Sequence, residues 1–355
     1  MTASTPTLTA WDHAKFAGVM CQTLTTLLTS VLTAGFRGES GASSYKRHVI
    51  YQTFRTFTRT NTTKQAQAAA GTSIDAYNAF VTKNGLKAEV VDLANNTRGA
   101  WLGDKSADTI ILWLHGGGYA LPLGVGHLQL IHELMLAGRS KDRNVSCFFL
   151  EYDLAPEGVY PRQLTQAAAA LQYLTTTAGI PPSRIILAGD SAGGNLSLGL
   201  LSHLLHPHPS IAPVSLATPL KGVVLVSPWV TFDQSAAAMK ANAYKDLLDG
   251  LVLKRWSDAF MGEAAVDNYN TPLAAGGEWW KGLPVGEVLV LAGTDEVFVG
   301  DVGAFVGHLK VHNGNKMEVV VAKGEAHDMP VLDYLLGFAP GEQTQAFHKW
   351  VLERA

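Results

Sequence analysis

The chain has 355 residues, of which 47% are hydrophobic and 16% are charged, with 27 Lys and Arg against 30 Asp and Glu. Intrinsically disordered chains have the opposite balance, so this composition indicates a folded globular protein. The net charge of −3 provides no basic surface for phosphates, and we expect no nucleic acid partner. The two cysteines, Cys21 and Cys147, are too few for a disulfide framework and have no metal-ligand spacing, which predicts no metal site.

The amino-terminal part, residues 1–85, is predicted to be mostly helical. Residues 16–36 contain no charged side chain and are numerous enough to span a bilayer. Gln22 and several Thr and Ser residues dilute the stretch, and no basic cluster precedes it, which argues against a secretory signal. We therefore expect an amphipathic helix that packs on the protein and a cytoplasmic location. Membrane or ER association through residues 16–36 is the alternative, and the sequence leaves a homo-oligomer open.

From about residue 86, short β-rich runs alternate with helical patterns. The runs are residues 109–115, 145–152, 184–189, 222–227, 287–292 and 317–322, and the helical patterns are 162–178, 192–205, 297–310 and 342–354. Nearly continuous apolar strands separated by helices are typical of a mostly parallel sheet covered on both faces, so we predict an α/β fold. Residues 87–93 and 99–102 are predicted to add an antiparallel hairpin at one edge.

One segment interrupts this alternation. Residues 229–285 lie between two predicted strands, are much longer than an ordinary connection and are rich in aromatic side chains. An insertion of this length in an α/β core is usually a lid or a binding loop. The alternative interpretation is that the aromatic side chains only pack the insertion onto the core. We expect the substrate to contact four aromatic residues of the chain, Tyr119, Trp229, Tyr244 and Trp280.

The strongest local motif is GDSAGG at residues 189–194, directly after a predicted strand and directly before a predicted helix. A serine on a sharp strand–turn–helix needs small neighbours, because the backbone is strained and the helix packs closely beneath it. Such a turn presents the hydroxyl of Ser191 outward, as a nucleophile requires. The alternative is an ordinary glycine-rich turn with a capping serine.

A second motif, HGGGY at residues 115–119, follows the strand of residues 109–115. Consecutive glycines let a loop direct several N–H groups toward one point, as an oxyanion hole requires. A phosphate-binding or merely flexible loop is the alternative, but no Lys-Ser/Thr pair follows, which argues against a nucleotide P-loop. We expect His115 to hold the loop rather than to act as a base.

Serine becomes a nucleophile when a base takes its proton and a third group orients that base. Asp295 and His327 each follow a predicted strand, and the carboxyl ends of parallel strands are where sites assemble. The order Ser191, Asp295, His327 is the order of α/β-hydrolase triads. Glu296 and Asp328 are the adjacent competitors, but neither begins the loop after its strand.

Together, HGGGY, GDSAGGNL, the AGTD loop of residues 292–295 and the late His327 resemble the hormone-sensitive-lipase-like family of α/β-hydrolases. YDLAPE at residues 152–157 is similar to that family's YRLAPE segment. The amino-terminal extension and the Trp279-Trp280 pair look like the fungal branch, whose members often serve secondary metabolism. Asp153 replaces the family's usual arginine, which puts a local salt bridge in doubt.

The resemblance implies an α/β-hydrolase fold whose lid comes from the amino-terminal helices and the insertion. The corresponding division is a lid segment 1–85, core 86–228, a lid insertion 229–270 and core 271–355. It also implies Ser191 as nucleophile, His327 as general base and acid, and Asp295 as the group that orients it. The implied oxyanion hole is formed by the N–H groups of Gly116, Gly117 and Ala192.

These inferences predict a serine esterase or deacetylase that cleaves a small hydrophobic ester through an acyl-Ser191 intermediate, without cofactor or metal. An acyltransferase or a cyclising enzyme could use the same triad if the lid excludes water. A third alternative is a non-catalytic ligand-binding protein, as in the gibberellin receptors that the family also contains.

Overall fold

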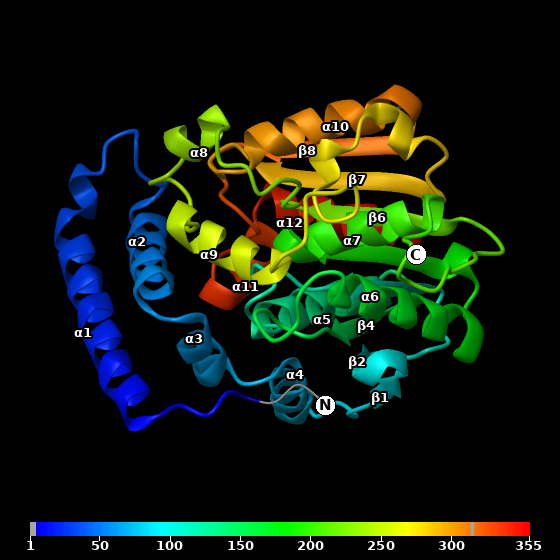
Figure 1. Ribbon diagram of the computed structural model, residues 1–355, viewed down its shortest axis with the longest axis horizontal. Coiled ribbons are helices and arrows are strands. Elements are labelled where there is room, and N and C mark those ends of the chain that lie inside the picture. Colours follow the sequence, from blue (N-terminus) through cyan, green and yellow to red (C-terminus); the bar gives the residue numbers. More distant parts are fainter. Residues whose placement is uncertain (1–4, 314–315) are drawn as a thin grey trace.

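The computed structural model describes residues 5–313 and 316–355, in which eight strands form one sheet with helices on both faces (Figure 1). The strands are β1 Val90–Leu93, β2 Thr97–Leu102, β3 Thr109–Leu114, β4 Val145–Glu151, β5 Ile185–Asp190, β6 Leu220–Val226, β7 Val285–Gly293 and β8 Met317–Ala322. Their order in the sheet is β1-β2-β4-β3-β5-β6-β7-β8. β1 and β2 form the antiparallel edge, and β3 to β8 are parallel to one another. The predicted α/β fold and its edge hairpin are confirmed.

The central strands are apolar throughout because helices cover both of their faces. Every residue of β3, β4 and β5 is buried. In the parallel register, Leu112 of β3 lies between Phe148 of β4 and Leu187 of β5. Parallel strands end at the same edge of the sheet, so the loops after β3, β5, β7 and β8 meet there.

Two helical layers enclose the sheet. α6 (Arg162–Gln172), α7 (Ser191–Leu205) and α10 (Val299–Asn313) pack on one face, and α5 (Val125–Arg139) and α12 (Glu342–Arg354) pack on the other. The prediction did not include α5. The predicted helix of residues 162–178 ends as an α-helix at Gln172 and continues as a short π-turn, Tyr173–Thr177.

The amino-terminal segment forms α1 (Ala10–Thr33), the short turn η1 (Ala34–Phe36), α2 (Tyr45–Thr60), α3 (Thr63–Ala70) and α4 (Ser73–Lys83). Threonine side chains cap the first N–H groups of α1, α3 and α4, which defines where these helices begin. α1 lies along α2 at the edge of the molecule, away from the sheet (Figure 1).

The insertion contains α8 (Ala237–Ala241) and α9 (Gly250–Met261), followed by the short turns η5 (Pro272–Ala274) and η6 (Gly277–Trp280). Arg255 of α9 donates hydrogen bonds to the carbonyl oxygens of Thr58 and Asn61, which ties α9 to the end of α2. A small apolar cluster joins α2 and the insertion to the chain after β8. The amino-terminal helices and the insertion therefore meet over the carboxyl edge of the sheet, while the exact domain limits stay a prediction.

Candidate active site

Ser191 is the first residue of α7, directly after β5. Its φ of 50° lies in the left-handed region, which is uncommon for a residue with a side chain and marks the strained turn that the motif predicts. A Cβ on Gly193 would lie 1.9 Å from the carbonyl oxygen of Leu114, so only glycine allows α7 to approach β3 this closely. The local sequence thus places the hydroxyl of Ser191 at the carboxyl edge of the sheet.

A cavity of about 590 Å³ opens in front of this serine. Ser191, His327 and Gly116 to Gly118 line its inner end. The rest of its wall is mainly apolar and comes from the lid helices, the insertion and the segment after His327; it includes Phe54, Phe57, Ala66, Ala69, Leu121, Leu247, Leu248, Leu253, Trp256, Val331, Leu332 and Leu335. The cavity therefore joins the reactive groups to a largely apolar binding space.

The glycine loop after β3 has free N–H groups, but they are not the same two that the sequence predicts for the oxyanion hole. The N–H of Gly116 donates to Oδ2 of Asp190 at 3.0 Å and is therefore occupied. Gly117 and Gly118 have φ values of 100° and 62°, and within the described chain their N–H groups make no hydrogen bond. The N–H of Ala192 belongs to the first turn of α7, where intrahelical acceptors are absent. Gly118 thus replaces Gly116 as the available donor beside Gly117 and Ala192.

Asp190 fixes the glycine loop after β3 through a hydrogen bond to its backbone. Its buried carboxylate accepts hydrogen bonds from Gly116, from Nε1 of Trp113 and from Nε2 of His127, each at 3.0 Å. Burial alone would raise the pKa of Asp190, but His127 outweighs burial and holds this pKa below its usual value. The carboxylate is therefore charged and positions the loop.

His115 has the structural place that the sequence predicts. Its Nδ1–H donates to the carbonyl oxygen of Gly116 at 2.8 Å, and its ring stacks on Tyr152 with the ring centres 4.2 Å apart. Burial lowers the pKa of His115 to about 4, so the imidazole is neutral at physiological pH.

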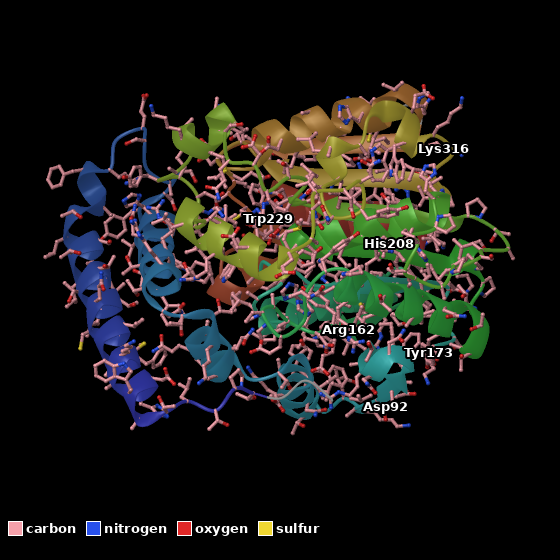
Figure 2. All side chains as sticks on the ribbon, viewed as in Figure 1. Asp92, Arg162, Tyr173, His208, Trp229 and Lys316 are labelled. Carbon is pink, nitrogen blue, oxygen red and sulfur yellow. The ribbon has the colours of Figure 1, made fainter. Side chains whose placement is uncertain are left out.

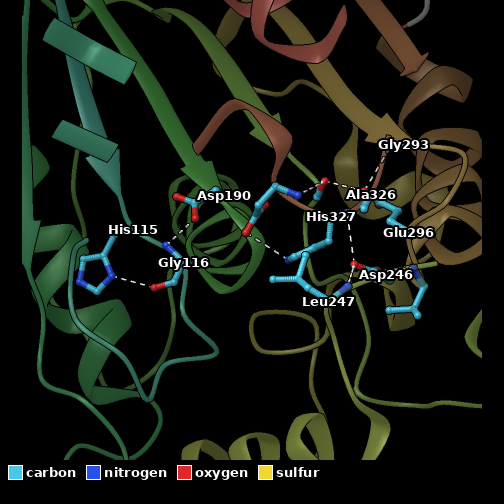
Figure 3. A network of polar contacts seen from close by, with 12 residues as sticks. His115, Gly116, Asp190, Asp246, Leu247, Gly293, Glu296, Ala326 and His327 are labelled. Carbon is cyan, nitrogen blue, oxygen red and sulfur yellow. Dashed lines mark hydrogen bonds and ion pairs between the residues drawn. The ribbon is translucent and has the colours of Figure 1, made fainter. Parts of the chain in front are cut away.

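His327 follows β8, is buried and lines the cavity. Figure 3 shows its contact with Asp246. The backbone N–H of His327 donates to Oδ1 of Asp246 at 3.4 Å, and its Nε2 lies 3.1 Å from Oδ2 of Asp328. Burial would lower the pKa of His327, but the carboxylates of Asp328, Asp246 and Glu296 outweigh burial and raise it to about 9.

The structure does not bring Asp295 beside His327. Asp295 is half-exposed and its carboxylate accepts a hydrogen bond from the Thr294 hydroxyl at 3.3 Å. Within the described chain, the acidic side chains whose charges act on His327 are those of Asp328, Asp246 and Glu296. Residues 293–296 form a tight turn, and the turn directs Asp295 outward and Glu296 inward.

Glu296 is fully buried and held by two donors (Figure 3). Its Oε2 accepts hydrogen bonds from the Ser227 hydroxyl at 2.6 Å and from the N–H of Gly293 at 3.1 Å. Among the residues described, its Oε1 and both ring nitrogens of His327 lack a hydrogen-bond partner. Burial raises the pKa of Glu296 to about 8, and the charge of His327 acts against this rise. Asp246 is less suited to orient the ring, since its oxygens accept backbone N–H groups.

The four aromatic residues expected to contact the substrate lie elsewhere. Tyr119 is buried, donates to Oδ1 of Asn195 at 2.6 Å and stacks on Phe260. Trp229 and Trp280 are buried in the core, Trp229 well inside the molecule (Figure 2), and neither borders the described cavity. Tyr244 is exposed and borders a different, more polar cavity. Tyr119, Trp229 and Trp280 therefore pack the core, whereas Trp256 is the aromatic residue of the insertion that lines the cavity.

The YDLAPE segment, which departs from the family pattern at Asp153, forms an ion pair in which the acidic residue lies in the segment and the basic residue lies in the following helix. Asp153 lies where the family has arginine, and its Oδ2 accepts a hydrogen bond from Nε of Arg162 at 2.7 Å. Gln163 and Gln166 bind the backbone of Asp153. The local salt bridge, in doubt from the sequence, is therefore present.

Within residues 5–313 and 316–355, no group of three or more His, Cys, Asp or Glu side chains could hold a metal ion.

The sequence argues against Asp328 as a member of the triad, because it does not begin the loop after its strand. In the structure it nevertheless contacts Nε2 of His327, the imidazole nitrogen that must face Ser191 in a triad. We expect Asp328→Asn to lower the pKa of His327, because one of the carboxylates that raise it is removed. A base works when neutral, so the acidic limb of the kcat/KM profile moves to lower pH, by about 1 to 2 pH units.

This result can be measured with a p-nitrophenyl ester between pH 5 and pH 10. Asp92→Asn is the matched control, because Asp92 is exposed on β1, far along the sheet (Figure 2). An unchanged acidic limb in Asp328→Asn would show that Asp328 has no influence on the base.

Comparisons with known proteins agree with the geometry. Residues 111–331 match the family model described as the alpha/beta hydrolase fold. An acetyl-hydrolase of Streptomyces hygroscopicus is 33% identical over 198 residues, which cover 55% of this chain and 59% of that protein. Steryl acetyl hydrolase 1 of Saccharomyces cerevisiae is 29% identical over 167 residues, 46% of this chain and 37% of that protein. The chain thus matches less than two thirds of either relative.

Among solved structures, a thermostable esterase from Pseudomonas putida aligns with a TM-score of 0.68 at 22% identity, covering 89% of this chain and 96% of that one. At this identity the likeness concerns the fold.

Proposed function

Since the chain belongs to the α/β-hydrolase fold family, we propose that it is a serine hydrolase that cleaves a carboxylic ester through an acyl-Ser191 intermediate. The observation that carries this proposal is the meeting of three features at one cavity: the strained Ser191, the buried His327 and the glycine loop with free N–H groups. A structural serine turn would not require a buried base and anion-binding amides beside it.

In the proposed reaction, His327 takes the proton of Ser191 as the hydroxyl oxygen attacks the ester carbonyl carbon. Gly117, Gly118 and Ala192 donate hydrogen bonds to the oxyanion of the tetrahedral intermediate. The bond to the leaving alkoxide breaks, and His327 returns the proton to it. Water then attacks the acyl-enzyme in the same way, which releases the carboxylic acid and restores Ser191.

We assign the orienting role to Glu296. Its Oε2 is fixed by Ser227 and Gly293, so that Oε1 remains for Nδ1 of His327. Asp328 adds a condition to this triad, because its carboxylate lies against Nε2 of His327. The imidazole must leave Asp328 before it can accept the proton of Ser191.

For the substrate, we propose a short acyl ester of an apolar alcohol. The largely apolar cavity of about 590 Å³ suits an apolar alcohol portion. Two of the relatives are named for acetyl hydrolysis, which favours an acetyl group. A role in secondary metabolism rests only on the resemblance to the fungal branch.

A fluorophosphonate probe tests the nucleophile directly. We expect it to form a covalent adduct that peptide mass spectrometry locates on Ser191, since the probe reacts only with an activated serine hydroxyl. Ser202, farther along α7 and bonded to the Asn268 carbonyl oxygen, provides the internal control and should remain unmodified. An unreactive Ser191 in folded protein would favour the ligand-binding alternative.

A further inference from the structure

The outer face of α1 is apolar and uncovered. We use this name for the side formed by Met20, Leu24, Leu28, Val31 and Leu32, which recur every three or four residues, all of them exposed. Leu32 is 78% exposed, and Phe36, just beyond the helix in η1, is 89% exposed. Soluble monomers rarely expose a continuous apolar stripe of this length, so the face requires an occupant.

The segment has the composition of a lipid-facing helix. Ala10–Phe36 is long enough to cross a membrane, and its most apolar window of 18 residues has a mean hydropathy of 1.4, with 11% of that window buried. Four of its five threonines have hydroxyls bonded inside the helix: Thr23, Thr25, Thr29 and Thr33 each donate to a carbonyl oxygen four residues earlier, at 2.8 to 2.9 Å. Polar groups satisfied inside the helix lower the cost of placing it against hydrocarbon.

The positions of the charged residues around α1 also agree with contact to lipid. No charged residue occurs from Phe16 to Phe36, whereas Lys15 precedes this stretch and Arg37 follows it. Cations at both ends of an apolar helix match the headgroup layer of a bilayer, which anionic lipids make negative.

The opposite side of α1 is held by the protein. Phe16 packs edge-on against Phe57 of α2, with the ring centres 6.3 Å apart. Nε2 of Gln65 donates to the carbonyl oxygen of Asp12 at 2.9 Å, and Tyr45 donates to that of Val31. α1 is therefore attached near both ends, and its free side faces outward along its whole length (Figure 2).

We propose that the outer face of α1 is a membrane-docking surface that lies flat in the headgroup region of a lipid bilayer. A spanning orientation would require α1 to leave α2, whereas a flat orientation keeps every contact just described. Phe57 both touches α1 and lines the cavity of Ser191, so a docked bilayer is one helix away from the candidate active site. The proposal does not depend on the chemistry at Ser191.

Vesicle sedimentation with the full chain tests the docking. Vesicles of phosphatidylcholine with phosphatidylserine should bind the protein, and Leu28→Glu with Leu32→Glu should lower the bound fraction about tenfold or more. Gln22→Glu is the matched control, because it adds a charge to an exposed position of α1 that is not part of the outer face. Hydrolysis of dissolved p-nitrophenyl acetate should be equal in all variants, which separates this proposal from the proposed function.

The orientation can be read from Cys21. This thiol is exposed on α1 and accepts a fluorescent label, whereas Cys147 is buried and burial raises its pKa, which makes it unreactive. Lipids with nitroxides near the headgroup should quench the label more strongly than lipids with nitroxides at the chain ends.

Four results would overturn the proposal. The first is that the wild-type protein does not sediment with the vesicles, and the second is that Gln22→Glu lowers binding as much as the Leu28→Glu, Leu32→Glu variant. The third is stronger quenching by nitroxides at the chain ends than by nitroxides near the headgroup, and the fourth is a soluble dimer that Leu28→Glu dissociates while no variant binds vesicles.

Discussion

Replacement of Ser191 by alanine should lower kcat/KM for p-nitrophenyl acetate by about 10⁴-fold or more, because no other group can form the acyl-enzyme. The stability of the fold should change little, since alanine removes one oxygen that lines the cavity. Residual hydrolysis above the rate in water is expected, because the amides of Gly117, Gly118 and Ala192 remain in place. The measurement is steady-state hydrolysis on purified protein whose folding is verified by circular dichroism.

Ser202→Ala is the control for this experiment. Ser202 lies on the same helix as Ser191, away from the cavity. The substitution removes a hydroxyl that donates a hydrogen bond to the Asn268 carbonyl oxygen. We expect its kcat/KM to remain within about threefold of the wild-type value. A Ser191→Ala protein as active as the wild type would exclude the acyl-Ser191 mechanism.

Replacement of Glu296 by glutamine should lower kcat by about 10² to 10⁴-fold. The amide keeps the volume of the side chain but cannot ionise. It therefore cannot supply the carboxylate that the imidazolium of His327 favours by lowering the pKa of Glu296. The effect should appear in kcat more than in KM, because Glu296 is buried behind His327 and does not line the cavity. Steady-state kinetics with p-nitrophenyl butyrate separate the two constants.

Asp295→Asn is the decisive control, because the two acidic residues are adjacent in the sequence. Asp295 is half-exposed and bonded to Thr294, so its loss should change kcat by less than about threefold. The reverse outcome, a large loss in Asp295→Asn and a small one in Glu296→Gln, would restore the assignment that the sequence motif favoured.

Prediction from the sequence succeeded where the signal was local. The strands around Ser191 were predicted because their apolar runs are continuous. The GDSAGG turn was predicted because its glycines tolerate a strained turn and leave room for the helix to pack closely beneath it. The exchange of charges between Asp153 and Arg162 was not predicted, although both residues stand in the motif region. A side-chain pair of this kind depends on how a loop folds back onto the next helix.

The sequence by itself determined the α/β fold, the strained serine turn, the glycine loop and a histidine after the last strand, because each depends on residues that are neighbours along the chain. Only the tertiary structure decided that Glu296 rather than Asp295 is buried where its charge acts on His327. It also decided that, in the described chain, the N–H of Gly118 rather than that of Gly116 is without a hydrogen bond, and that none of the four predicted aromatic residues borders the cavity. In the tight turn of residues 293–296, adjacent residues point in opposite directions, so a shift of one position exchanges the inward and the outward side chain. A hydrogen bond from Gly116 to Asp190 joins residues 74 positions apart, which no local pattern records.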